Sequence, residues 1–230
     1  MNARILALLY GPHYQLHRRI LDSFKLAVPK DVPVTLWLNQ VERSTLQRIG
    51  DERGRYDLIE SPDNVKKYVA MRAMMTRSSV KRPDWWIWFD DDSYITAPDW
   101  WNKTVQFIEQ RKAENICYVG QKWFVHHLPG QWEFMEKATW FRGRPSEIIR
   151  GKPGVNFATG AYWWLRADIQ ATIDWPDVRL GHNGGDTLLG EAIYQNGLRL
   201  HHWDYGVQVN RGPRRGYSDA PAGSRVDIRR

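Results

Sequence analysis

Short apolar runs alternate with helical patterns through the first ninety residues, and this alternation restricts the fold more than any other feature of the sequence. Four runs have the length and composition of buried strands: 5–10, 34–38, 56–59 and 85–89. Between them, apolar residues recur at helical spacing in three segments: 16–28, 46–49 and 65–75. This order predicts an α/β fold, in which helices flank a mostly parallel, doubly wound central sheet.

The second half of the chain is less regular. Helical patterns cover 98–112 and 187–195, and strand-like runs cover 116–119, 157–165 and 198–203. Segment 124–157 is rich in aromatic residues, Gly and Pro, which is typical of a long functional loop or a small subdomain. We expect one domain over residues 1–210, followed by a basic tail at 211–230.

Composition limits the class of protein. A chain of 230 residues can bury a core without help from a metal ion or a disulfide. The single cysteine, Cys117, excludes an internal disulfide framework and a cysteine-based zinc site. No run approaches the ~20 apolar residues of a membrane span. The apolar stretch at the start is too short for a signal peptide, so we expect a cytoplasmic protein.

The net charge of +7 indicates an acidic partner. Segment 211–230 carries six arginines against two aspartates, more than half of this excess. One interpretation is a solvated tail. The other is an arm that grips phosphate, because arginine makes bidentate contacts to phosphate oxygens.

Three consecutive carboxylates, Asp90, Asp91 and Asp92, follow the apolar run 85–89 directly. Such neighbours repel one another, and Mg²⁺ or Mn²⁺ relieves the repulsion because hard cations prefer carboxylate oxygen. Side chains alternate along a strand, so Asp90 and Asp92 are expected to face one ion together. The alternative is an acidic turn that caps a helix.

Segment 88–95, Trp-Phe-Asp-Asp-Asp-Ser-Tyr-Ile, resembles the DxD segment of metal-dependent glycosyltransferases with the GT-A fold, and is most similar to fringe-like and β-galactosyltransferase-like enzymes. Segment 157–165 resembles the small-residue strand on the acceptor side of these enzymes. Segment 184–190 resembles the acidic start of a helix that carries their catalytic base. The resemblance extends over residues 3–205 in the order of elements, with 1–97 as the nucleotide-sugar half and 98–210 as the acceptor half.

The resemblance implies transfer of a sugar from a nucleotide-diphosphate sugar, with UDP-sugar as the expected donor and Mn²⁺ or Mg²⁺ as the cofactor. Many relatives carry Glu-Asp at the base position, whereas this chain has Gly185-Asp186. Asp186 is therefore the residue that matches the base of an inverting displacement.

Other site residues are implied only by their match to the family pattern. Tyr10 and Gly11 match the end of the first strand, where the family holds the base. For Asn39 and Glu60 the alternatives are contacts to base or ribose and ordinary polar groups at a strand end. Cations on the helix before the DxD segment match the diphosphate contacts: Lys66 or Lys67, and Arg72.

The DxD carboxylates and two later histidines complete the expected donor site. The resemblance assigns ribose or metal binding to Asp90 and metal binding to Asp92, with Asp91 between them. A histidine after a late strand often joins the same ion in relatives. His201 and His202 are the candidates, and the sequence does not choose between them or exclude an ordinary surface or core role.

Some phage-type glycosyltransferases modify hydroxymethylated pyrimidines in DNA, and double-stranded DNA of this kind is our preferred acceptor. The expected location is then the cytoplasm of a bacterium or of a phage-infected host. The aromatic segment 123–141 could replace the extruded base. Candidate contacts to DNA are basic residues and a tryptophan pair: Arg142, Arg144, Arg211, Arg214, Arg215, Trp163 and Trp164.

Three alternatives remain open. The same chemistry could act on a saccharide or a lipid-linked glycan at a membrane surface, where basic residues meet anionic headgroups. Carboxylate clusters also build the two-metal sites of nucleotidyl- and phosphotransferases and nucleases. A non-catalytic nucleic-acid-binding module would need no acidic triplet after a buried strand. The oligomeric state is not predicted.

Overall fold

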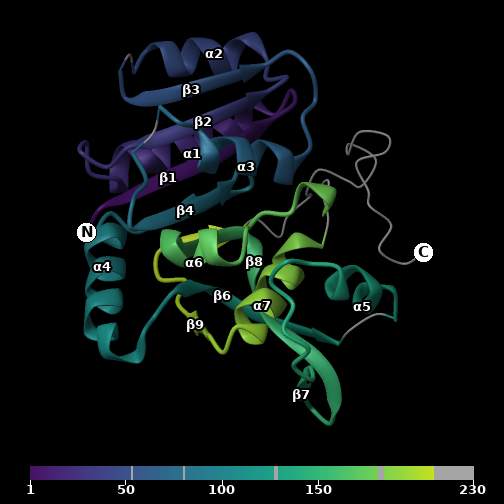
Figure 1. Ribbon diagram of the computed structural model, residues 1–230. Coiled ribbons are helices and arrows are strands. Elements are labelled where there is room, and N and C mark those ends of the chain that lie inside the picture. Colours follow the sequence, from purple (N-terminus) through teal and green to yellow (C-terminus); the bar gives the residue numbers. More distant parts are fainter. Residues whose placement is uncertain (53, 80, 127–128, 181–183, 210–230) are drawn as a thin grey trace.

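The computed structural model describes residues 1–52, 54–79, 81–126, 129–180 and 184–209. Its main feature is a mixed central sheet with the strand order β3-β2-β1-β4-β8-β6-β9, and β7 pairs with β8 at one end (Figure 1). The strands are β1 (Ala3–Tyr10), β2 (Val34–Asn39), β3 (Tyr56–Ser61), β4 (Trp85–Asp90), β6 (Tyr118–His126), β7 (Glu147–Ile149), β8 (Lys152–Arg166) and β9 (Leu200–His202).

The first four strands are parallel to one another, as the βαβ pattern predicts. β8 lies antiparallel between β4 and β6, and β9 is parallel to β6. The carboxyl ends of β1, β2, β3 and β4 therefore meet at one edge of the sheet, which is where ligands bind in open α/β sheets.

Side chains of the central strands alternate between two cores. Ile5, Ala7 and Leu9 of β1 face one core, and Leu6 and Leu8 face the other. β4 follows the same rule: Trp85, Ile87 and Phe89 face the first core, whereas Trp86 and Trp88 face the second. Because both faces are covered, these strands are apolar along their whole length.

Helices cover both faces of the sheet. Residues of α1 (Tyr14–Ala27), α2 (Arg43–Gly50) and α4 (Trp100–Gln110) pack into the first core. Residues of α3 (Lys67–Thr76), α5 (Pro129–Glu136), α6 (Ala167–Thr172) and α7 (Gly185–Gln195) pack into the second core. On α1, Ile20, Leu21 and Phe24 are buried at helical spacing, which explains why this segment folds as an amphipathic helix.

A small second sheet lies next to the turn that follows β4. β5 (Ser93–Ile95) pairs antiparallel with β10 (Val207–Val209), with Ser93 opposite Val209. The Ser93 hydroxyl lies 2.7 Å from the carbonyl oxygens of both Asp90 and Ala161, which positions the acidic turn against β8. Two 3-10 turns, η1 (Lys112–Glu114) and η2 (Val178–Leu180), complete the described elements.

The predicted α/β class with a mostly parallel sheet is confirmed, and each apolar run of the first half is a strand. Segment 124–157 is neither one loop nor a separate unit: it contains α5, β7 and the start of β8, which pairs with the outer half of β6. Pro153 and Gly154 hide the alternation of β8 in the sequence. Among the described residues, no helix combines the length and hydropathy needed to cross a membrane.

Candidate functional site

The acidic triplet is divided between the two faces of the sheet. Asp90 is the last residue of β4 and shares the face of Trp86 and Trp88, because alternate strand residues point to the same side. Asp91 lies in the turn after β4 and reaches the opposite side, where α1 packs. Asp92 is half-buried in the same turn.

Asp91 is fully buried and ties two ends of the fold together. Its Oδ2 accepts a hydrogen bond from the Tyr10 backbone N–H at 2.9 Å and lies 3.3 Å from Nε2 of His17, which is also fully buried. His17 Nδ1 lies 2.8 Å from the Thr45 hydroxyl of α2. Asp91 thus joins β1 and α1 to the turn after β4 and has no side-chain surface to offer a ligand.

Asp90 faces a buried lysine. Lys67 Nζ, from the first residue of α3, donates to Asp90 Oδ2 at 2.6 Å and to the Gly160 carbonyl of β8 at 2.8 Å. The Trp88 indole N–H donates to the other Asp90 oxygen at 2.9 Å. The Lys67 ammonium also lies 5.6 Å from the Trp88 ring centre and 5.8 Å from that of Tyr68, within the range of cation–π attraction.

Asp186 approaches the same lysine from α7. A methyl group built on Gly160 would lie 3.3 Å from Asp186 Oδ2 and 3.4 Å from Lys67 Nζ, so a larger residue at position 160 would press on both groups. Asp186 belongs to the first turn of α7, and its Oδ1 accepts from the Thr187 backbone N–H at 3.0 Å. Asp90 and Asp186, 96 positions apart, therefore meet around Lys67.

The start of α7 is held by glycines. Gly184 has φ of +80°, a left-handed conformation that glycine adopts without strain. A Cβ on Gly185 would lie 2.1–2.5 Å from atoms of the Tyr68 ring, so only glycine lets α7 begin this close to α3. The Gly-Gly pair, not an acidic residue before Asp186, sets the position of the carboxylate.

Burial perturbs the acids of this cluster. Desolvation raises the pKa of Asp186 above the ordinary aspartate value, although the nearby Lys67 ammonium opposes the shift. Burial, followed by the charges of Asp186 and Asp90, raises the pKa of the Tyr68 hydroxyl well above its ordinary value. Tyr68 is therefore a neutral group beside both carboxylates at physiological pH.

The carboxylates of the acidic turn suit a hard divalent ion that takes most of its other ligands from substrate phosphates. Among the described residues, no three Asp, Glu, His or Cys side chains gather as a complete metal cage. Asp90 lies in the Lys67 cluster, and Asp92 is the half-buried carboxylate two residues further along the turn. One or two carboxylates together with substrate phosphates are the usual ligands of Mg²⁺, so this pair fits such an ion.

The nucleotide-binding candidates lie at the expected ends of the strands. Tyr10 ends β1, and Gly11 follows with φ of +66° and donates its N–H to the Asn39 carbonyl at 3.0 Å. Asn39 is buried, and its side chain holds the loop before α3 by bonding the Val65 backbone in both directions, at 2.7 and 2.9 Å. Glu60 is exposed on the edge strand β3.

The contacts of Arg72 are with the loop after α6 and not with Asp90 or Asp186. Its guanidinium donates to Asp174 Oδ1 at 2.6 Å and to the Pro176 carbonyl at 3.1 Å. These contacts attach α3 to the loop after α6, and the side chain is already committed to them. Lys66 is exposed at the start of the same helix.

The two late histidines lie at the far edge of the sheet. β9 is three strands away from β4 in the sheet order. His201 Nδ1 is 3.8 Å from Glu114, and His202 Nδ1 accepts from the Lys122 backbone N–H at 3.1 Å. Neither contact involves the acidic triplet.

The acceptor candidates have mixed placements. Trp163 and Trp164 are buried in opposite cores, and Trp163 stacks on Trp88 at 6.1 Å between ring centres, so neither ring is available at the surface. Arg142 and Arg144 are exposed. Three other candidates lie outside the described residues: Arg211, Arg214 and Arg215.

Several residues around the site were not identified from the sequence. Tyr68, Gly160 and Gly185 shape the cluster around Lys67, and His17 supports Asp91. His17 carried a usable signal, because it lies at helical spacing from the buried Ile20, Leu21 and Phe24 of α1. The others depend on contacts between distant segments, which the local sequence pattern does not contain.

Comparisons with solved structures show the same fold in glycosyltransferases. A mannosyltransferase from Pyrobaculum calidifontis, solved with GDP-Man and Mn²⁺, matches 94% of this chain with a TM-score of 0.64 and 15% identity. TarS 1–349 of S. aureus matches 88% with a TM-score of 0.59 and 14% identity. GalNAc-T7, solved with UDP, GalNAc and Mn²⁺, matches 87% with a TM-score of 0.59 and 12% identity.

This chain spans 58% of the length of the first two matched structures and 41% of the third. No family model and no curated protein sequence matches it. The α/β architecture of this chain is therefore that of GT-A glycosyltransferases, the fold expected from its acidic triplet and strand order.

Proposed function

We propose that this chain is a metal-dependent glycosyltransferase that moves a sugar from a nucleotide-diphosphate sugar to an acceptor hydroxyl. The observation that carries the proposal is the meeting of Asp90 and Asp186 around Lys67 at the carboxyl end of β4. One carboxylate ends the strand at which this fold binds ligands, and the other opens a helix that faces it.

Asp186 is the proposed general base. Its raised pKa brings the carboxylate closer to the range in which it can take a proton from a hydroxyl group. The acceptor oxygen then attacks the anomeric carbon as the bond to the nucleotide diphosphate breaks. A single displacement of this kind inverts the configuration at that carbon.

Asp90 and Asp92 are the proposed ligands of Mn²⁺ or Mg²⁺. When bound, the ion supplies Lewis-acid stabilisation of the charge on the departing diphosphate. Lys67 keeps Asp90 oriented by a short ion pair. Its ammonium is a second positive charge, beside that of the metal ion, next to the Asp90 carboxylate. Tyr10 and Gly11, at the end of β1, are the proposed contacts for the nucleotide.

The proposed donor is a UDP-sugar. GalNAc-T7 was solved with UDP, and TarS 1–349 was also solved with UDP-GlcNAc, whereas the mannosyltransferase holds GDP-Man. The two nucleotides differ in the base, so the residues beside Tyr10 have to discriminate between them.

The proposed acceptor is a hydroxymethylated pyrimidine in double-stranded DNA, and charge supports it. The chain has a net charge of +7, and exposed arginines such as Arg142 and Arg144 lie in the acceptor half. Exposed cations of this kind bind phosphate backbones without sequence preference.

The function is tested by measuring nucleotide release from UDP- and GDP-sugars with Mn²⁺, with and without hydroxymethylated duplex DNA. We expect release that depends on Mn²⁺ and is stimulated by the modified duplex but not by unmodified DNA. Stimulation by free saccharides alone would replace the DNA acceptor with a glycan. Cleavage of DNA, or no release with any donor, would reject the transferase.

A further inference from the structure

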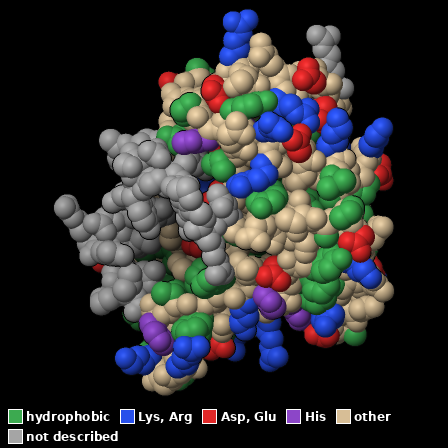
Figure 2. Space-filling view, turned by 180° about the vertical axis from the view of Figure 1, so that it is seen from behind, with side chains coloured by type: hydrophobic (Ala, Val, Ile, Leu, Met, Phe, Trp, Pro, Cys, Tyr) green, Lys and Arg blue, Asp and Glu red, His purple; other side chains and the backbone are tan. Residues whose placement is uncertain are grey.

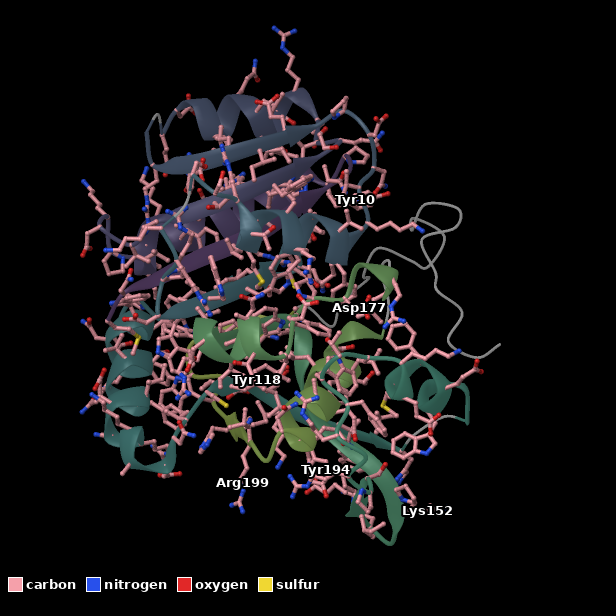
Figure 3. The ribbon with its side chains drawn as sticks, in the orientation of Figure 1. Tyr10, Tyr118, Lys152, Asp177, Tyr194 and Arg199 are labelled. Atoms are coloured by element: carbon pink, nitrogen blue, oxygen red, sulfur yellow. The ribbon has the colours of Figure 1, made fainter. Side chains whose placement is uncertain are left out.

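A basic pocket lies at the carboxyl end of α7, apart from the candidate donor site. Its volume is about 400 Å³, and its lining comes from β6, β7 with the segment before it, β8, α7 and the turn that leads into β9. Its charged, polar and aromatic lining residues are Lys122, Arg144, Glu147, Asn156, Tyr194 and Arg199. In Figure 3, Tyr194 and Arg199 lie in the lower part of the molecule, away from Tyr10.

Positive charge exceeds negative charge in this lining. Lys122, Arg144 and Arg199 contribute cations, and Glu147 is the one acidic side chain among the described lining residues. Glu147 Oε2 already accepts a hydrogen bond of 2.6 Å from the Asn156 side chain. On the face seen in Figure 2, basic side chains project from the lower edge of the molecule beside histidines.

The three cations differ in how they are held. Arg144 is fixed, because its Nη1 donates to the Tyr194 carbonyl at 2.8 Å and its guanidinium stacks 4.7 Å from the Tyr194 ring centre. This contact covers one of the carbonyls at the negative end of α7. Lys122 and Arg199 are exposed, and neither side chain forms an ion pair or hydrogen bond with the described part of the chain.

The pKa of the neighbouring His201 is consistent with an excess of positive charge around the pocket. Partial burial, and then the charges of Arg111, Arg199 and Lys122, lower the pKa of His201, while Glu114 opposes the shift. His201 is therefore neutral at physiological pH and adds no charge. The pocket keeps two cations, Lys122 and Arg199, ready for an anion.

The pocket and the candidate base Asp186 lie along the same face of α7. Asp186, Gly190, Ile193 and Tyr194 are spaced by four, three and one residues, which puts them along one side of the helix. The pocket begins at Gly190, about 6 Å along the axis from Asp186 at 1.5 Å per residue. A Cβ on Gly190 would lie 2.3 Å from the Asn156 carbonyl, so close packing separates the pocket from the site.

We propose that this pocket binds a phosphate group of the acceptor strand and anchors DNA at a distance from the reacting sugar. Arginine supplies bidentate donors to phosphate oxygens and lysine supplies a point charge. Contacts to remote parts of an acceptor contribute binding energy that positions the reacting hydroxyl. The proposal rests on the proposed function, because it takes DNA as the acceptor.

The test compares two double variants with the same loss of charge. Lys122→Gln with Arg199→Gln removes the unpaired cations of the pocket. Lys30→Gln with Lys103→Gln removes two exposed lysines on the other side of the sheet, and is the control. Affinity for a short fluorescein-labelled hydroxymethylated duplex is measured by anisotropy across a series of NaCl concentrations.

We expect the slope of log affinity against log salt to fall by about 2 in the pocket variant, one for each phosphate contact, and to stay near the wild-type value in the control. Equal slopes in the two variants would overturn the proposal that the pocket binds a DNA phosphate. Pocket-dependent binding to phosphatidylglycerol vesicles but not to the duplex would also overturn it, in favour of a lipid surface.

Donor hydrolysis without acceptor separates this proposal from the proposed function. Both double variants should hydrolyse UDP-sugar with Mn²⁺ at the wild-type rate, because neither touches the Lys67 cluster. If the duplex binds through the pocket but no sugar is ever transferred to it, the pocket stands and the proposed acceptor reaction fails. If sugar is transferred to the duplex but the salt slope of the pocket variant equals that of the wild type, the transferase function is supported and phosphate binding in the pocket is rejected.

Discussion

At the scale of single residues, Lys67 controls the charge of the candidate site. It is 7% exposed, pairs with Asp90 at 2.6 Å and lowers the pKa of Asp186 against the larger effect of burial. A buried ammonium favours the charged form of a nearby carboxylate, so the protonation of Asp186 depends on this lysine.

Replacing Lys67 should shift the pH dependence of transfer. In Lys67→Met the pKa of Asp186 loses its opposing charge and rises further, so the acidic limb of the pH–rate profile moves to higher pH. The exposed Lys103→Met is the control and should leave the limb in place. Initial rates of nucleotide release, measured from acidic to mildly alkaline pH, provide the test. An unmoved limb would exclude Asp186 as the titrating base.

Removing the Asp186 carboxylate should cost activity and increase stability. As a general base it contributes roughly 10²–10⁴-fold, so Asp186→Asn should lose that much transfer while donor affinity is kept. Its pKa is raised on folding, so the ionised carboxylate weakens the native state as pH rises through the raised pKa. Melting curves at neutral pH should show the Asp186→Asn variant melting at a higher temperature than the wild type.

This stability gain should shrink as pH falls toward the ordinary aspartate value, because the wild-type carboxyl group is then protonated as well. Near-normal turnover in Asp186→Asn, or a lower melting temperature at neutral pH, would contradict the assigned role of this residue.

At this scale the sequence indicates the two carboxylates as candidates, and their roles stay predictions, but it does not indicate the residues that surround them. Asp90 and Asp186 stand in local patterns, one after an apolar strand and one after Gly-Gly. Arg72 is committed to Asp174, and Asn39 to Val65, by contacts between segments that no local pattern encodes. The assignment of Asp90 to metal or ribose stays a prediction.

At the scale of elements, the turn after β4 works because its carboxylates are divided between the two faces. Asp91 connects this turn to β1 and α1 through Tyr10 and His17, so the position of Asp90 and Asp92 depends on a buried neighbour.

Asp91→Ala should therefore be a stability variant. The Tyr10 N–H would lose its buried acceptor, which costs about 1–3 kcal/mol. The free energy of unfolding in urea measures the effect, and Asp92→Ala, half-buried in the same turn, is the matched comparison with a smaller expected loss. Equal losses for the two variants would mean that Asp91 does not hold the turn.

The contact between α7 and α3 gives a second test at this scale. Gly185→Ala puts a methyl group within 2.1–2.5 Å of the Tyr68 ring, and overpacking of this kind costs about 1–3 kcal/mol. Gly50→Ala, at the end of α2 with open space around its Cβ position, is the control and should stabilise by up to about 1 kcal/mol. Urea unfolding of both variants checks the prediction. A fully stable and active Gly185→Ala variant would contradict the close approach of α7 to Tyr68.

The elements themselves were largely predictable where periodicity is strong. The four parallel strands, α1 and α7 follow from apolar runs and helical spacing. β5, β7 and β10 have three residues each, which is too few for a period to be recognised. The outer half of β8 contains Pro153 and Gly154, and its pairing with β6 depends on the rest of the sheet.

At the scale of the whole molecule, the sheet order brings distant segments to one edge. The parallel strands supply Tyr10 and the acidic turn, and the antiparallel β8 supplies Gly160, against which α7 places Asp186. The order of β8, β6 and β9 did not follow from the sequence, because it depends on packing between residues far apart in the chain. The late histidines were expected near the metal, whereas β9 puts them at the far edge of the sheet.

Titration calorimetry of UDP-sugar into the protein, with and without Mn²⁺, tests the central claim that the acidic turn and the Lys67 cluster form a donor site. We expect binding that requires Mn²⁺ in the wild type and is lost in Asp92→Asn, with the melting temperature of the variant unchanged. Binding of equal strength in both proteins, or binding indifferent to Mn²⁺, would contradict it.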